Sequence, residues 1–375
     1  MSRIFLSAPH ISGRERELVS EVFDSNYVAP TGEMLVRFES AVSEYCGIEH
    51  AVALSSGTAA IHLALLILGV GKGDEVWTSS MTFVGGVSPI TYVGATPVFF
   101  DLSEETWVID TGLLEESLAS AAKENRLPKA IIPTDLYGQA CDLAVIMAMA
   151  EKYGVPVISD SAEALGAFIG DRHAGKGANA AVFSFNGNKI ITTSGGGMLL
   201  SDDKSFIDRA LYLSTQARQP FIHYEHTEIG YNYRLSNVCA AIGVGQLECI
   251  EDKIAARRNI FDTYVDELKS IGQFRFMPEP DQYRSTRWLT CAMLEGDDTP
   301  IQLQKLYTLC EESEIEIRPL WKPMHMQPVF TGSKFVGSGV CEKLSSSGVC
   351  LPSASGMTES EQERVIDTIR QAVAG

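Results

Sequence analysis

Residues 182–197 read Val182-Phe-Ser-Phe-Asn-Gly-Asn-Lys189-Ile-Ile-Thr-Thr-Ser-Gly-Gly-Gly197. The apolar start predicts a buried strand that ends in polar residues and Lys189. The chain then passes through three glycines into a second apolar segment. A lysine in such a turn can act as an amine nucleophile toward an aldehyde. Taken alone, it could also be a solvated loop residue or part of a phosphate-binding glycine loop. The order Gly-x-x-x-x-Gly-Lys-Ser/Thr is not found here, which excludes a P-loop.

Apolar segments with helical segments between them lie on both sides of this stretch. Strands are expected at 51–54, 75–78, 97–100, 130–133, 155–160, 180–185 and 197–200. Their hydrophobicity is continuous rather than alternating, which favours a mostly parallel sheet covered by helices on both faces. The predicted fold class is therefore α/β, with ligands bound at the carboxyl ends of the strands.

The character of the sequence changes near residue 245. Beyond it, the pattern predicts a charged helix, two strand-like segments and an amphipathic helix, at 248–268, 287–293, 314–318 and 359–374. We therefore predict a large domain over residues 1–245, beginning with two short helices within 13–46, and a smaller α+β domain over residues 246–375.

The composition narrows the classes of function. A formal net charge of −18 argues against a nucleic-acid partner, because binding phosphate backbones needs a basic face. The eight cysteines are scattered without a Cys-x-x-Cys pair, so neither a zinc site nor any other metal site is expected. No apolar run is long enough for a signal peptide or a membrane helix. A cytoplasmic enzyme is the simplest interpretation.

Two acidic residues lie at the end of the strand predicted at 155–160. Asp160 stands at its carboxyl end, and Glu163 comes three residues later. A carboxylate that faces a pyridine nitrogen keeps the ring protonated and so makes it an electron sink. Asp is also a common helix N-cap, which is the alternative for Asp160 alone.

A turn with small and hydroxyl residues, Ser55-Ser56-Gly57-Thr58, joins the first strand to a helix. Backbone N–H groups at a helix start suit a phosphate group. Phe83 could stack on a flat ring or belong to the core. The order of phosphate turn, aromatic residue, strand-end Asp160 and strand-end Lys189 supplies every contact that pyridoxal phosphate (PLP) needs. We therefore predict a PLP enzyme.

Four motifs carry a family resemblance over nearly the whole chain: Ser56-Gly-Thr-Ala-Ala60, Asp160-Ser-Ala-Glu-Ala164, Ser184-Phe-Asn-Gly-Asn-Lys189 and Gly230-Tyr-Asn-Tyr-Arg-Leu-Ser-Asn237. Together with Leu6-Ser-Ala-Pro-His10 and Leu351-Pro352, they resemble the DegT/DnrJ/EryC1/StrS family of PLP-dependent nucleotide-sugar aminotransferases. The resemblance implies a fold-type-I PLP-dependent transferase.

The resemblance also implies roles for individual residues. Lys189 would form a Schiff base with PLP and then move the proton between the amine carbon and the cofactor. Asp160 would pair with the pyridine nitrogen, Glu163 would lie near the ring hydroxyl, and Phe83 would stack on the ring. The residues expected at the phosphate are Gly57, Thr58, Ser184 and, from the partner subunit of a homodimer, Asn237. L-glutamate is the usual amino donor.

Some segments depart from the common family pattern. Glu163 stands where many relatives carry Gln or His, and Ser214-Thr-Gln-Ala-Arg218 replaces a Lys-x-His-Gly segment. Four segments look most like the branch that makes UDP-4-amino-4,6-dideoxy-N-acetyl-glucosamine, the bacillosamine precursor: Asn186-Gly-Asn-Lys189, Ser214-Thr-Gln-Ala-Arg218, His223-Tyr-Glu-His226 and Arg318-Pro-Leu-Trp-Lys-Pro-Met-His325. The expected substrate contacts are Asn26, Tyr27, Val28, Ala29, Pro30, Ser56, Arg234, Arg318, Trp321, Lys322 and His325.

Other functions stay open at this point. The amine could go to a GDP- or dTDP-linked keto sugar or to the epimeric UDP-4-amino-altrose product. A deoxysugar dehydratase of the same family characteristically carries His in place of the lysine, so Lys189 argues against it. A nucleotide-dependent oxidoreductase would need Gly-x-Gly-x-x-Gly between strand and helix, and Gly69-Val-Gly-Lys-Gly73 comes after a helix instead. A PLP-binding regulator without turnover is a non-enzymatic alternative.

Overall fold

The computed structural model describes residues 2–11, 13–271, 273–296 and 298–373. Its main sheet consists of two four-stranded groups, ordered β1-β9-β8-β5 and β4-β2-β3-β14. Parallel bridges from Ile131 to Val157 and from Thr134 to Asp160 join the groups through β4 and β5. The strands are β1 (His50–Leu54), β2 (Glu75–Ser79), β3 (Thr96–Phe100), β4 (Ala130–Ile132), β5 (Ile158–Asp160), β8 (Ala180–Ser184), β9 (Gly197–Ser201) and β14 (Phe335–Val336).

All strand pairs of this sheet are parallel except those of β9, which runs antiparallel to both β1 and β8. The prediction of an α/β fold with a mostly parallel sheet is confirmed. Because β1, β5 and β8 point the same way, the segments that come after them meet at one edge of the sheet. The glycines after Lys189 allow the chain to turn back as β9, and this turn keeps Lys189 at that edge.

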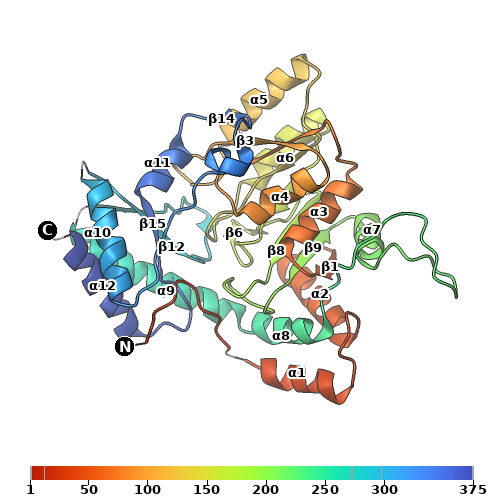
Figure 1. The fold of residues 1–375 in the computed structure, drawn as a ribbon, viewed down its shortest axis with the longest axis horizontal. Coiled ribbons are helices and arrows are strands. Elements are labelled where there is room, and N and C mark those ends of the chain that lie inside the picture. The colour runs from red at the N-terminus through yellow and green to blue at the C-terminus, as the bar shows by residue number, and fades with distance from the viewer. Residues whose placement is uncertain (1, 12, 272, 297, 374–375) are drawn as a thin grey trace.

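Helices cover both faces of the sheet (Figure 1). The cover comes from α1 (Glu15–Asp24), α2 (Glu33–Cys46), α3 (Gly57–Ile67), α4 (Val84–Tyr92), α5 (Thr111–Lys123), α6 (Leu143–Tyr153), α7 (Lys204–Ser214) and α8 (Asn237–Leu247). Neighbouring strand residues pack into different cores: Val182 lies in the cluster with α3, α4 and α7, and Phe183 in the cluster with α2, α6 and α8. Burial on both faces explains the continuous apolar strands of the sequence.

A second sheet, antiparallel throughout, has the order β10-β12-β15-β13. Its strands are β10 (Phe274–Phe276), β12 (Thr290–Leu294), β13 (Arg318–Pro319) and β15 (Gly348–Leu351), and the helices near it are α9 (Ile250–Leu268), α10 (Thr299–Glu312), α11 (Val340–Ser347) and α12 (Glu359–Val373). Short strands β6 (Phe168–Ile169), β7 (Arg172–His173) and β11 (Tyr283–Arg284) form a third sheet.

Two strand contacts cross the domain boundary predicted at residue 245. Ile4 bridges Ile315, and β14 pairs with β3 at the edge of the main sheet. The strand expected at 314–318 is thus divided between a bridge at Ile315 and strand β13. The last helix ends at Val373, and residue 374, which the sequence pattern places within it, lies outside the described residues.

In the described ranges, no helix has both the length and the apolar character needed to cross a membrane.

Candidate active site

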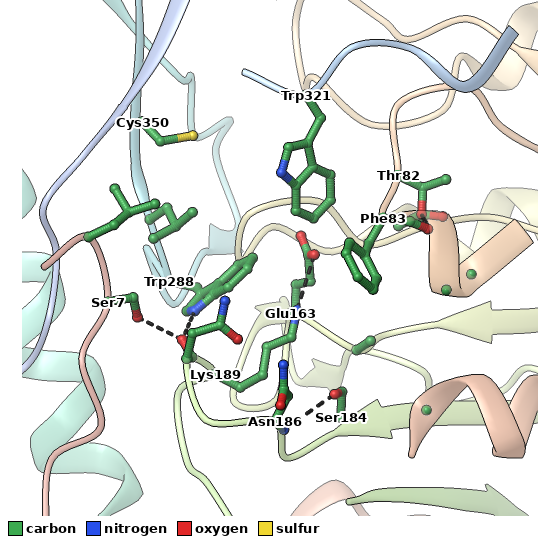
Figure 2. A pocket seen from close by; sticks show the side chains of 18 of the residues that line it. Ser7, Thr82, Phe83, Glu163, Ser184, Asn186, Lys189, Trp288, Trp321 and Cys350 are labelled. Carbon is green, nitrogen blue, oxygen red and sulfur yellow. Dashed lines mark hydrogen bonds and ion pairs between the residues drawn. The ribbon is translucent and has the colours of Figure 1, made fainter. Parts of the chain in front are cut away.

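A cavity of about 910 Å³ opens at the carboxyl ends of β1, β5 and β8. Most of the residues predicted for cofactor or substrate line it: Ser56, Gly57, Thr58, Phe83, Asp160, Glu163, Ser184, Lys189, Arg318, Trp321 and Lys322. Figure 2 shows how the labelled side chains lie around it. One wall comes from the main sheet. The opposite wall comes from β13, the residues on either side of it and the segment that leads into β12.

Lys189 lies beyond β8 in a turn closed by its own backbone N–H, which donates to the Asn186 carbonyl oxygen. Its side chain is nearly buried, with 11% exposed. The Nζ atom lies 3.2 Å from Glu163 Oε1 and 3.9 Å from the centroid of the Trp288 ring. The amine is therefore held in the cavity between a carboxylate and an aromatic face.

Asp160 ends β5 and is buried. Burial and the neighbouring Glu163 carboxyl raise the pKa of Asp160 to about 7. A side-chain methyl at Gly86 would lie 2.5 Å from Asp160 Oδ2, so the glycine leaves room in front of that oxygen. Burial also raises the pKa of Glu163, although the nearby charge of Lys189 acts in the opposite direction. Glu163 Oε2 accepts a hydrogen bond from Tyr137 N at 2.9 Å.

Helix α3 starts at the cavity. The side chain of its N-cap residue, Ser56, accepts a hydrogen bond from Ala59 N. The backbone N–H groups of Gly57 and Thr58 lie in the first turn of the helix, where they have no acceptor within the helix. Both residues line the cavity together with Ser184. The helix dipole and free N–H groups make this a site that suits an anion such as a phosphate.

Gly197 is needed for this arrangement, because β9 begins directly against the start of α3. A Cβ atom on Gly197 would lie 2.3 Å from Gly57 N. We expect Gly197→Ala to push α3 away, lower the free energy of unfolding by about 1–3 kcal/mol and weaken PLP binding roughly tenfold. Denaturant unfolding and PLP titration of the cofactor-free protein measure both effects.

Gly195→Ala is the matched control, because a Cβ there meets nothing within 4 Å. Its stability should stay within about 0.5 kcal/mol of the unmodified protein. Equal stability of the two variants would contradict the close packing of Gly197 against α3.

Aromatic side chains face the cavity from two sides. The Phe83 and Trp321 ring centroids are 5.9 Å apart, and 57% of Phe83 is exposed. An apolar ring this exposed at a cavity wall can cover a flat ligand. Trp321 is anchored through its backbone N–H, which donates to Tyr137 Oη at 2.9 Å.

The described residues fit PLP. A buried carboxyl with a raised pKa suits a ring nitrogen that carries a proton, the start of α3 suits the phosphate, and Lys189 lines the same cavity. When bound, the cofactor supplies an electron sink for chemistry at an amine carbon. An α/β fold with this lysine, carboxylate and anion site defines a PLP-dependent enzyme of fold type I.

The chain belongs to the DegT/DnrJ/EryC1/StrS aminotransferase family, whose sequence model matches residues 9–370. It is 47% identical over 371 residues to EpsN of Bacillus subtilis (strain 168), which is assigned to the PLP-dependent aminotransferases; the match covers 98% of this chain and 95% of EpsN. It is 35% identical to the GDP-perosamine synthase of Caulobacter vibrioides, covering 100% of this chain and 99% of that protein. The prediction of a PLP-dependent sugar aminotransferase is therefore confirmed.

Solved structures agree with the fold. A DegT DnrJ EryC1 StrS aminotransferase from Brucella abortus has a TM-score of 0.87 and 29% identity, with 96% of this chain and 95% of that chain covered. The aminotransferase TlmJ from Streptoalloteichus hindustanus has a TM-score of 0.90 and 27% identity, with 99% of both chains covered.

Other predicted residues lie elsewhere. In the part of the chain that the structure describes, the cavity lining does not include Asn26–Pro30, Arg234, Asn237 or His325. Arg234 pairs with Glu39 at 2.6 Å, and His325 lies between Ser80 Oγ and Glu342. The substrate or cofactor assignments of these eight residues stay predictions.

Asn237 binds the N-terminal region of its own chain. Its side-chain oxygen accepts from the backbone N–H groups of Met34 and Leu35, and its amide nitrogen donates to Tyr27 O. If Asn237 also contacts the cofactor of a partner subunit, it must do so with the same side-chain amide that binds the 26–30 loop.

Some lining residues carried no recognisable signal in the sequence. Trp288 lies in an irregular region ahead of β12, and Ser7 belongs to a segment that supported the family resemblance without an assigned role. Within the described ranges, no cluster of three or more His, Cys, Asp or Glu side chains could hold a metal ion.

Proposed function

We propose that this enzyme transfers an amino group from L-glutamate to C4 of a UDP-linked 4-keto-6-deoxy-N-acetyl-hexosamine. The product would be UDP-4-amino-4,6-dideoxy-N-acetyl-glucosamine, used in glycan biosynthesis in the cytoplasm. The active unit would be a homodimer with Asn237 reaching the partner's site.

The observation that carries the proposal is the placement of Lys189 Nζ in a cavity large enough for a cofactor and a nucleotide sugar together. The opposite wall offers two cations, Arg318 and Lys322, and the ring of Trp321. Guanidinium and ammonium groups bind diphosphates, and an aromatic ring can stack on a nucleobase. Arg318 is solvent-accessible and paired with Glu316 at 2.7 Å, so it can turn toward a ligand.

The side chains around Lys189 have separate tasks in this reaction. Lys189 Nζ is the only proposed proton carrier, and it would move a proton between the amine carbon and the cofactor. Glu163 keeps the amine in place at 3.2 Å. Asp160 would hold the proton-bearing ring nitrogen of the cofactor, and the aromatic walls would exclude water.

The choice of a UDP sugar rests on the segments 186–189, 214–218, 223–226 and 318–325, which resemble the bacillosamine branch. A GDP-linked 4-keto sugar is the second candidate. GDP-perosamine synthases of Caulobacter vibrioides and Escherichia coli O157:H7 match this chain over nearly their full length at 35% and 34% identity.

The test offers the purified enzyme UDP-, GDP- and dTDP-linked 4-keto-6-deoxy sugars separately, each with ¹⁵N-labelled L-glutamate. We expect mass spectrometry to find a labelled amino sugar with the UDP-N-acetyl substrate and at least about tenfold less with the others. Turnover of only the GDP- or dTDP-linked sugar would refute the proposed substrate. Product without the label would refute glutamate as the donor.

A further inference from the structure

The ring of Trp288 faces the amine of Lys189. Nζ lies 3.9 Å from the ring centroid, and on its other side Glu163 Oε1 is 3.2 Å away. In Figure 2 the three side chains point toward one another. An ammonium group over the face of a tryptophan is attracted by the ring quadrupole, and this attraction grows when the site is desolvated. The site thus provides two different contacts for a protonated lysine.

Trp288 has little freedom to move. Its side chain is buried, and its Nε1–H donates to the Asn188 carbonyl oxygen at 2.6 Å. Its own carbonyl oxygen accepts from Arg257 Nη1 at 2.5 Å. The preceding residue, Arg287, has a φ of +50°, a backbone conformation that non-glycine residues adopt only when the surroundings enforce it.

The same contacts fix the peptide directly before Lys189. The Asn188 carbonyl oxygen also accepts from Ser7 Oγ at 2.6 Å, and Ser7 Oγ in turn accepts from Arg257 Nη2 at 3.2 Å. Arg257 is buried, and burial lowers its pKa to about 9. Its acceptors in this network are neutral oxygens, so burying its charge is costly. The four residues form a closed ring of hydrogen bonds that ties the Trp288 ring to the Lys189 backbone.

We propose that Trp288 is a positioning residue that holds the Lys189 ammonium whenever the amine is not bonded to the cofactor. The inference rests on the proposed function, in which Lys189 is released during each turnover and must be recaptured. The charged groups that face Lys189 are Glu163 and Asp160. A cation–π contact holds an ammonium group less strongly than an ion pair with a second buried carboxylate would. The ring therefore keeps the Lys189 amine in the site without preventing it from moving to the cofactor.

The experiment measures acylation of Lys189 by acetic anhydride in cofactor-free, full-length enzyme, with mass spectrometry of the Lys189 peptide. Only the free amine reacts, so a ring that stabilises the ammonium slows the reaction. We expect Trp288→Leu to raise the rate roughly fivefold near pH 7, with Trp288→Phe in between because it keeps an aromatic face. The exposed lysines Lys72 and Lys129 are the internal controls, and their rates should not change.

The pH dependence separates charge stabilisation from mere access. At the high pH where the acylation rate of each variant has stopped rising, the rate reports access to the amine alone, so the rates should converge there. An equal rate in all variants near pH 7, or an increase of the same size at both pH values, would overturn the proposal. If Trp288→Leu does not fold, the Trp288→Phe rates decide by the same criterion.

The experiment contains no sugar, so its result does not depend on the substrate. Adding PLP to each variant and recording the visible absorption band tests the cofactor role of Lys189 separately. A variant that binds PLP normally but acylates like the unmodified protein refutes only the role of Trp288.

Discussion

Replacing Lys189 by alanine should lower kcat/KM roughly 10⁴-fold, because the amine that carries the proton is lost. The other lysine of the described lining, Lys322, belongs to the opposite wall. The protein should also purify without the visible absorption of covalently held PLP. Activity assays with glutamate and the keto sugar measure the first effect, and an absorption spectrum measures the second.

Two further variants make this result interpretable. Lys152→Ala changes an exposed lysine on α6 and should leave both readouts unchanged. Lys189→Arg keeps a positive charge but provides no nucleophilic amine, so it should fail like the alanine variant. A visible band that survives in Lys189→Ala would mean that another residue holds the cofactor.

Replacing Asp160 by asparagine should lower kcat about 10²–10³-fold, because a neutral amide cannot stabilise a protonated ring nitrogen in a buried site. The variant should still bind PLP, since Lys189 and the start of α3 are unchanged. Rapid-mixing absorbance with glutamate alone should show the defect without any sugar substrate. A rate within about threefold of the unmodified enzyme would refute the role of Asp160.

The same substitution should stabilise the cofactor-free protein at high pH. The pKa of Asp160 is raised from 3.8 to about 7, so the folded state binds the proton more tightly than the unfolded state. Stability due to this group is therefore complete below about pH 4 and is lost as the pH rises toward 7. Near pH 8 we expect Asp160→Asn to melt a few degrees higher than the unmodified apoprotein.

Thermal unfolding at both ends of this pH range tests the direction of the predicted change in melting temperature. Below about pH 4 the two proteins should melt alike, because a protonated carboxyl and an amide have nearly the same shape and charge. Asp135, whose pKa burial raises to about 6, is present in both proteins, and its charge also acts on Asp160. A melting difference that does not depend on pH would exclude titration of Asp160 as its cause.

Much of the main sheet could be predicted from the sequence, because buried parallel strands are short apolar runs and functional groups collect where they end. Lys189 and Asp160 are recognisable in this way. The strand predicted from residue 155 begins only at Ile158. Pro156 has no N–H to offer a neighbouring strand, which accounts for the shorter element.

Contacts between distant segments could not be predicted. The bond from Trp288 Nε1 to Asn188 O spans 100 residues, and the bond from Ser7 Oγ to the same oxygen spans 181. Arg234, a predicted substrate contact, pairs with Glu39, which is 195 residues away. Nothing local marks such pairs, because they depend on how whole elements pack.

Tyr137 joins the two walls of the cavity. Its backbone N–H donates to Glu163 on the cofactor side, and its hydroxyl oxygen accepts from Trp321 N on the opposite side. It is fully buried and has a φ of +53°. Arg318 and Lys322, the proposed substrate contacts, can be varied without touching the buried carboxyls, whereas Tyr137 must stay. Diversification among sugar substrates can thus proceed on one wall while the chemistry on the other is inherited unchanged.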